Sequence, residues 1–291
     1  MSMPSAPEPG KPAERANGAA SIYRRQIRTR TLAAGTVVGA LEDNPHHFRV
    51  RVEHDDERVT RIEAESVRYP WTTCPSAEAP LRALEGMRLS PRSTAVGQAA
   101  RARDNCTHMF DLAGLCVAHA HRAVRGGPGE RHYACAVWND PSAGAGCTRA
   151  TLARDGAPLL EWVMRDGRIL HPAPFRGVSL RDHFMAWAER QLAQGLAEAA
   201  LVLRRACFIA PSRLFDFDRV ERADALEGMQ GACHTFSAAH VGEALRNPGT
   251  YRDYSACPER MLEGLPERGE SLGETPPAAA HNSTGRPRCS R

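Results

Sequence analysis

Alternating apolar and polar residues mark the first strong element of this chain. In residues 46–54, Phe48, Val50 and Val52 alternate with charged side chains, which is the period of a strand with one buried face. A polar turn follows, and residues 58–67 return as the partner strand. We therefore predict a β-hairpin in this part of the chain.

Helical spacing follows the hairpin in two places. Pro75 suits the first position of a helix that ends at Gly86, with Cys74 as its N-cap. A second helix is predicted to begin near Cys106. Its apolar stripe, with spacings of three and four residues, consists of Phe110, Ala113, Val117 and Ala120.

The second half of the chain begins with a longer run of strand-like segments. Residues 132–140 and 148–172 are rich in strand formers and contain two Asp-Gly pairs, which are strong hairpin signals. We predict a meander of three or four antiparallel strands. Residues 179–209 then show helical spacing interrupted at Gly195, which predicts one long bent helix or two consecutive helices.

This order of elements predicts an α+β fold, with antiparallel hairpin and meander sheets packed with helices. The ordered part is expected to be a single domain over residues 21–257, with sub-halves at about 21–125 and 130–257. Residues 1–20 and 258–291 are rich in Pro, Gly, Ser and charge. Such a composition buries too little apolar surface to offset the entropy lost on ordering, so we predict disordered tails there.

Composition and charge narrow the class of protein. The chain is 42% hydrophobic and 25% charged, as in ordinary globular domains, and its formal net charge is +4. Basic residues are interleaved with acids, which argues against nucleic acid as a partner. Because a membrane span and the apolar core of a secretory signal are both missing, we predict no membrane partner and a cytoplasmic location.

Metal-binding side chains are concentrated between Cys106 and Asp111. On a helix, His108 and Asp111 share a face with His119, whereas Cys106 joins them only from a position before the first turn. Thiolate, imidazole and carboxylate are all good ligands for zinc or iron. We therefore predict a metal centre, possibly an enzymatic one, to which other segments also contribute. The predicted ligands are Cys74, Cys106, His108, Asp111, Cys233 and His234.

A metal-free cysteine enzyme is the first alternative. A helix N-terminus lowers the pKa of a thiol, and both Cys74 and Cys106 are predicted to lie at helix starts. His108 or His234 would act as the general base, oriented by Asp111. The candidate catalytic residues are therefore Cys74, Cys106 and His108.

The second alternative is a non-catalytic binding or accessory module. Asn105 or Thr107 would cap the helix, and Cys106 would pack as a small buried group. His108 and Asp111 would then form a solvated pair worth a few tenths of a kcal/mol.

Two side chains near Cys74 suit a small-molecule ligand. Arg68 offers a planar cation and Trp71 a large amphipathic ring. Together they are suited to a carboxylate or an aromatic group. An unidentified small molecule is therefore a candidate partner.

Several of these segments occur together in a known family. They include the motifs W-x-x-C-P-x-A at residues 71–77 and N-C-T-H-x-F-D at residues 105–111, along with EDNPHHFRVRVEH and CHTF. In this combination the chain resembles the bacterial domain of unknown function 2889 family over roughly residues 21–257. The resemblance implies a bacterial, intracellular protein of one family domain, and it implies no reaction.

Overall fold

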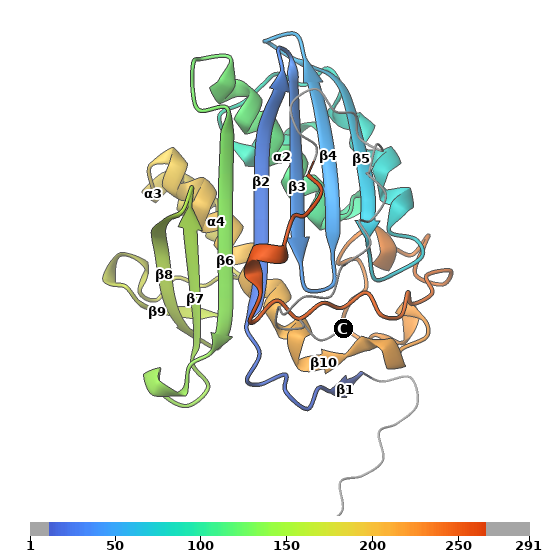
Figure 1. The fold of residues 1–291 in the computed structure, drawn as a ribbon, viewed down its shortest axis with the longest axis vertical. Helices are drawn as coiled ribbons and strands as arrows, with labels where there is room; N and C mark the ends of the chain where they lie inside the picture. Colours follow the sequence, from blue (N-terminus) through green and yellow to red (C-terminus); the bar gives the residue numbers. More distant parts are fainter. Residues whose placement is uncertain (1–11, 266–291) are drawn as a thin grey trace, which may run out of the picture.

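One large antiparallel sheet dominates the computed structural model, which describes residues 12–265 (Figure 1). Its strand order is β5-β4-β3-β2-β6-β7-β8-β9. These strands span Tyr23–Ala33 (β2), Thr36–Asp43 (β3), His47–His54 (β4), Val59–Arg68 (β5), Glu130–Asn139 (β6), Thr148–Arg154 (β7), Ala157–Arg165 (β8) and Arg168–His171 (β9). A two-stranded sheet pairs Ala13–Glu14 (β1) with Phe215–Asp216 (β10). The predicted α+β fold with antiparallel sheets is confirmed.

The predicted hairpin corresponds to β4 and β5, and the predicted meander to β6, β7, β8 and β9. The pattern did not indicate β2 and β3. Strand β3 lacks alternation because all but one of its residues are buried, so apolar side chains face both ways. Strand β2 pairs with β3 on one side and β6 on the other, and thereby joins the two predicted sub-halves into one sheet.

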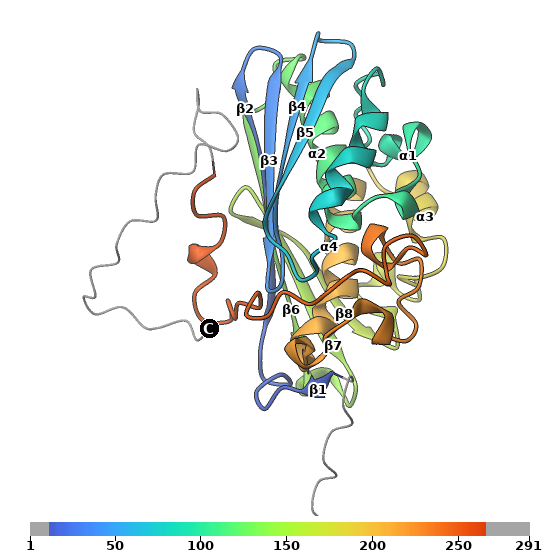
Figure 2. The ribbon, with the colours of Figure 1, turned by 90° about the vertical axis from the view of Figure 1, so that its right-hand side faces the viewer.

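Helices cover one face of the sheet (Figure 2). They are Val96–Ala99 (α1), Thr107–Ala123 (α2), Phe184–Gln191 (α3) and Gln194–Ile209 (α4). The predicted helix after Cys74 is instead a 3-10 run over Pro75–Leu84, within which Pro80 removes an interior N–H donor. Shorter 3-10 turns lie at Ser93–Ala95, Ala102–Asp104, Pro141–Ala143, Ala173–Phe175, Ala210–Leu214, Phe217–Arg219, Ala223–Ala225, His234–Phe236 and Pro258–Arg260.

The segment that ends at residue 265 crosses the opposite face of the sheet (Figure 2). Glu42 on β3 accepts hydrogen bonds from the Tyr254 hydroxyl and the Leu262 backbone N–H, each at 2.6 Å. The predicted disordered tails, 1–20 and 258–291, lie mainly outside the described residues. Where they are described, they differ from the prediction: β1 forms at one end, and Leu262 is buried at the other.

Helix α2 packs directly on β2 and β3, and His119 is buried in this contact. Its ring nitrogens lie 3.1 Å from the Thr29 hydroxyl and 3.3 Å from the Thr31 hydroxyl. Burial is the main cause that lowers the pKa of His119, to about 4, and the nearby Arg122 adds to it. The folded protein therefore holds a neutral imidazole at this position.

This burial predicts acid sensitivity. The unfolded chain binds a proton at His119 near pH 6.5, and the folded chain only near pH 4. The contribution of His119 to stability is therefore complete above about pH 6.5 and is lost as the pH falls towards 4, by up to about 1.4 kcal/mol per pH unit. Urea unfolding should show that the free energy of unfolding decreases less between pH 7.5 and pH 5 in His119→Gln than in the wild type. The exposed His171→Gln is the control; equal decreases in all three proteins would contradict this account.

Candidate metal centre and the neighbouring thiols

The structure separates the predicted ligands on α2. Cys106 lies just before the helix, in an extended conformation, as the N-cap residue. Asp111 faces α4, where its carboxylate accepts a hydrogen bond from Arg205 Nε at 2.6 Å. His108 is turned about 60° away from Asp111 around the helix axis and faces the end of β3. The predicted centre of Cys106, His108 and Asp111 is therefore not formed.

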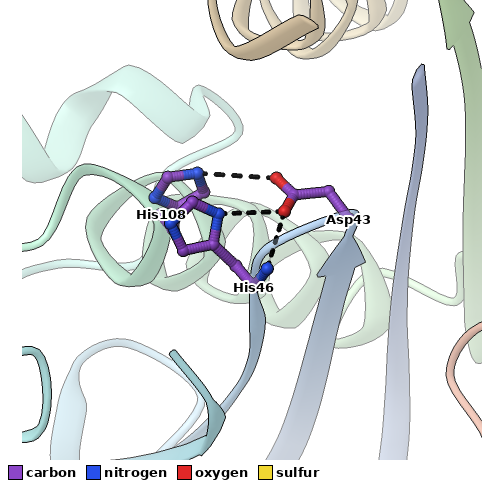
Figure 3. A group of neighbouring side chains, drawn as sticks. All are labelled: Asp43, His46 and His108. Carbon is purple, nitrogen blue, oxygen red and sulfur yellow. Dashed lines mark hydrogen bonds and ion pairs between the residues drawn. The ribbon is translucent and has the colours of Figure 1, made fainter. Parts of the chain in front are cut away.

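His108 instead meets two residues from the turn between β3 and β4 (Figure 3). The Nδ1 atom of His46 lies 2.9 Å from Asp43 Oδ1, and the Nε2 atom of His108 lies 3.6 Å from Asp43 Oδ2. One ligand atom from each of the three residues lies within 4.8 Å of the other two. Asp43 and His108 are buried, and His46 is only partly exposed.

Local sequence builds the turn that carries Asp43 and His46. In the segment Asp43-Asn44-Pro45-His46, the Asp43 carboxylate accepts the His46 backbone N–H at 2.9 Å. The backbone N–H of Asp43 donates a hydrogen bond to the His46 carbonyl oxygen, also at 2.9 Å. Asp, Asn and Pro favour such turns because the side chain replaces a backbone acceptor and the proline ring restricts φ. The two metal-binding side chains are thus oriented by their own backbone.

Arg68 holds this turn from the neighbouring strand. Its Nη1 donates to the carbonyl oxygens of Asn44 and Thr250, both at 2.6 Å. Its Nη2 donates to the Asp43 carbonyl at 2.8 Å and to Glu42 Oε1 at 2.9 Å. Arg68 is predicted from the sequence to bind a ligand; in the structure both of its terminal nitrogens donate hydrogen bonds to the protein itself, so it is a positioning residue.

Asp43 is the electrostatic centre of the cluster. Its Oδ2 accepts the Tyr23 hydroxyl at 2.8 Å and Arg25 Nη1 at 3.0 Å. Burial by itself would raise the pKa of Asp43, but His46 and His108 together lower that pKa well below its usual range. The carboxylate therefore stays ionised in a buried position, balanced by the Arg25 guanidinium.

His108 is held as a neutral base. Burial, followed by the proximity of His46, lowers the pKa of His108 to about 3. Its Nε2 atom has no hydrogen-bond partner among the described residues. A buried polar atom without a partner is costly and calls for an explanation, such as a water or an ion that belongs at that position.

The three cysteines among the predicted ligands are not members of this cluster. Cys74, Cys106 and Cys233 are free, and the first two are buried. Burial is the largest cause that raises the pKa of each: to about 11 for Cys74, and above the usual value for the other two. These shifts are opposite to the lowering that a helix N-terminus was expected to produce. They disfavour the metal-free nucleophile because the thiols are protonated at neutral pH.

The CHTF segment contacts both other predicted segments. The ring of His234 bridges them, with Nε2 2.8 Å from the Ser76 hydroxyl and Nδ1 3.1 Å from the Asp104 carbonyl. Both nitrogens are therefore engaged, unlike those of a metal ligand with a free lone pair. Trp71, predicted as a ligand-binding ring, is buried and packs edge-on against Phe236.

Asp43 and His46 are the members of the cluster that sequence reasoning missed. A signal for them exists in the Asp-Asn-Pro-His turn next to a strand, because a carboxylate and an imidazole three residues apart in a tight turn can share one ion. The turn alone offers two ligands. The third, His108, comes from a helix 62 residues further along the chain, counted as 108 minus 46.

Together, the large sheet covered by helices and the mostly buried His-His-Asp cluster define an α+β protein with a candidate metal centre. Residues 23–122 match the model of the family described as "Protein of unknown function (DUF2889)". This match supports the family that the motifs indicated, over a shorter range than the predicted 21–257. It includes Asp43, His46 and His108 but not Cys233.

The other comparison adds no relative, since none of the curated proteins matches the chain. Among the described residues, no helix has both the length and the apolar character needed to cross a membrane.

Proposed function

We propose that this protein binds a divalent transition-metal ion, zinc or iron, through Asp43, His46 and His108. The observation that carries the proposal is the convergence of three ligand atoms within 4.8 Å, two of them on buried side chains. The Nε2 atom of His108 supports it, because this atom has no hydrogen bond, lies 3.6 Å from Asp43 Oδ2 and belongs to a neutral imidazole, the form that offers a lone pair to a metal ion.

The surroundings of Asp43 suit this role. Tyr23 and Arg25 both donate to Asp43 Oδ2, so the carboxylate is oriented by neighbours that do not themselves bind metal. Hydrogen bonds of this kind, from residues that do not bind the metal, are common around metal-binding carboxylates and fix their direction. Arg68 supplies the same support to the backbone of the turn.

A set of two imidazoles and one carboxylate also limits the chemistry. Two His and one acidic residue occur in catalytic zinc sites and in ferrous oxygenase sites, and both keep at least one position open for water or a substrate. A centre of this composition is therefore suited to an enzyme that activates a bound water or oxygen-containing substrate. A purely structural zinc site would close its coordination with four protein ligands.

Metal titration tests the proposal. We expect chelator-treated protein to bind about one equivalent of Zn²⁺ at this centre. His46→Ala should weaken that binding at least about 100-fold, since replacing even a residue that only orients a metal ligand costs about 10–100-fold. His46 is preferred for substitution because it lies on a turn and is partly exposed. Isothermal titration calorimetry provides the measurement, with circular dichroism as the check on folding.

His171→Ala, at an exposed position on the far edge of the sheet, is the matched control and should bind like the wild type. Equal Zn²⁺ affinity in wild type, His46→Ala and His108→Ala would contradict the proposal. The cluster would then be a buried hydrogen-bonded support in a non-catalytic binding or accessory module.

A further inference from the structure

A serine and a histidine from distant segments meet at the start of the 3-10 run Pro75–Leu84. The Oγ atom of Ser76 lies 2.8 Å from Nε2 of His234, and the Thr73 hydroxyl donates to the Thr235 hydroxyl at 3.1 Å between the same two segments. We propose that Ser76 and His234 form a catalytic dyad, nucleophile and general base, for the hydrolysis of a carboxylic ester. The dyad shares no residue with the candidate metal centre, and the proposal holds whether or not that centre binds metal.

The second ring nitrogen of His234 determines the direction of this hydrogen bond. Its Nδ1 atom lies 3.1 Å from the backbone carbonyl oxygen of Asp104. A carbonyl oxygen can only accept, so Nδ1 carries the ring proton of the neutral imidazole and Nε2 presents its lone pair to Ser76. Burial is the main cause that lowers the pKa of His234, which favours the neutral form at pH 7. From its hydrogen-bond partners, the imidazole is therefore assigned to the tautomer that a general base needs.

The Ser76 hydroxyl has one proton and two acceptors within reach. Besides His234 Nε2, the carbonyl oxygen of Thr73 lies 2.8 Å from Ser76 Oγ. A rotation of the O–H bond alone therefore brings the proton onto the imidazole, without any movement of the heavier atoms. Ser76 is exposed whereas His234 is buried. A substrate can thus reach the nucleophile while the base stays largely shielded from water.

Main-chain and ring contacts orient the imidazole. The backbone N–H of His234 donates to the Asn105 carbonyl at 3.0 Å, directly next to the Asp104 carbonyl that holds Nδ1. The ring of His240 lies against the His234 ring, with centroids 4.1 Å apart and an interplanar angle of 34°. In nucleophile–base pairs a third group usually fixes the orientation of the base. Here the Asp104 carbonyl has that role, and it makes Asp104 a positioning residue.

The reaction proceeds through an acyl-enzyme. Ser76 Oγ forms a bond to the carbonyl carbon of the ester while its proton moves to His234 Nε2, and the alcohol takes that proton as the ester C–O bond breaks. Water then gives a proton to Nε2 and attacks the acyl carbon, and the acid departs as Ser76 Oγ takes the proton back. Ser76 is the second residue of the 3-10 run, where backbone N–H groups have no partner within the helix. Its N–H can therefore donate to the oxyanion that forms in each step.

Covalent labelling of the full-length protein tests the dyad. A fluorophosphonate probe reacts with a serine nucleophile by forming an Oγ–phosphorus bond and releasing fluoride, and a chelator in the buffer removes any metal-dependent reaction. We expect one adduct per chain, located on Ser76 by peptide mass spectrometry. Ser76→Ala should abolish the adduct, and His234→Gln should slow its formation at least about 100-fold, as expected for the loss of a general base. Hydrolysis of p-nitrophenyl acetate should decrease in the same two variants.

Ser142→Ala is the matched control, because Ser142 is also exposed but donates to the Asp140 carboxylate instead of an imidazole. It should be labelled at the wild-type rate. No adduct on Ser76 in folded wild type, or unchanged labelling of folded His234→Gln, would overturn the proposal.

A second pair of variants tests the imidazole without removing it. Ser76→Cys places a thiol beside His234, and Ala79→Cys places one at an exposed position of the same 3-10 run. A neighbouring imidazole lowers the pKa of a thiol, so at pH 7 iodoacetamide should alkylate position 76 at least about threefold faster than position 79. Equal rates at the two positions would show that His234 does not act on the side chain at position 76, and would likewise overturn the proposal.

Discussion

Asp43→Asn should lower the free energy of unfolding by about 3–5 kcal/mol, the usual cost of removing one partner from a buried ion pair. Arg25 and Asp43 are both almost completely buried, at 1% and 0% exposure, and their charged atoms lie 3.0 Å apart. Arg25 Nε and Nη2 have no hydrogen-bond partner within residues 12–265. Without the Asp43 charge, the guanidinium would be left in the core with no counter-ion.

Urea unfolding in the presence of a chelator measures this effect without any contribution from bound metal. Glu53→Gln is the control, because Glu53 pairs with Arg51 near the surface, where such pairs contribute about 0–1 kcal/mol. The double substitution Arg25→Met with Asp43→Leu should recover part of the loss, since it removes both buried charges. If Asp43→Asn lowered the free energy of unfolding by less than about 1 kcal/mol, the Asp43 carboxylate would not be needed to stabilise the buried Arg25 charge.

Gly114→Ala should destabilise the protein by about 2 kcal/mol, although alanine is the better helix former by about 1 kcal/mol. Gly114 lies in α2, and a Cβ atom there would be 2.1 Å from the backbone carbonyl oxygen of Ser93. A backbone atom cannot rotate away as a side chain can. The helix and the segment around Ser93 would therefore have to separate, and packing would be lost along their contact.

Gly97→Ala in α1 provides the comparison. A Cβ atom at Gly97 would meet no atom within 4 Å, so the substitution should be neutral or slightly stabilising. Relative to the wild type, the thermal unfolding midpoints of the two variants should thus shift in opposite directions or by clearly different amounts. A stable Gly114→Ala would show that the Ser93 segment moves aside at little cost.

The regular parts of the fold follow from local patterns. In β4 apolar residues alternate with charged ones, and α2 carries apolar residues at helical spacing, although nearly all of its residues from His108 to Ala120 are buried. The sequence pattern did not predict strand β3, because a strand buried on both faces shows no alternation of apolar and polar residues. Its second cover is the segment that contains Tyr254 and Leu262, a contact between residues more than 200 positions apart.

The candidate site was predictable only in part. His108 belongs to the cluster. Thr235 and His234 bring the CHTF segment into contact with Cys74 and Asn105. Asp111 bonds to Arg205 instead. Spacing along one helix indicates which side chains share a face, but it does not indicate which other element that face meets.

By itself, the sequence determined the local structures: the hairpin, the meander, the start of α2 at Cys106, and the Asp43-Asn44-Pro45-His46 turn, because each depends on residues close together along the chain. Only the tertiary structure decided that this turn lies over the first turn of α2, so that Asp43 and His46 meet His108. It also decided that Thr235, in the CHTF segment, lies beside the Cys74 sulfur. Such meetings depend on how distant elements pack on one sheet, and that packing follows from the shape and burial of the whole core rather than from any single segment.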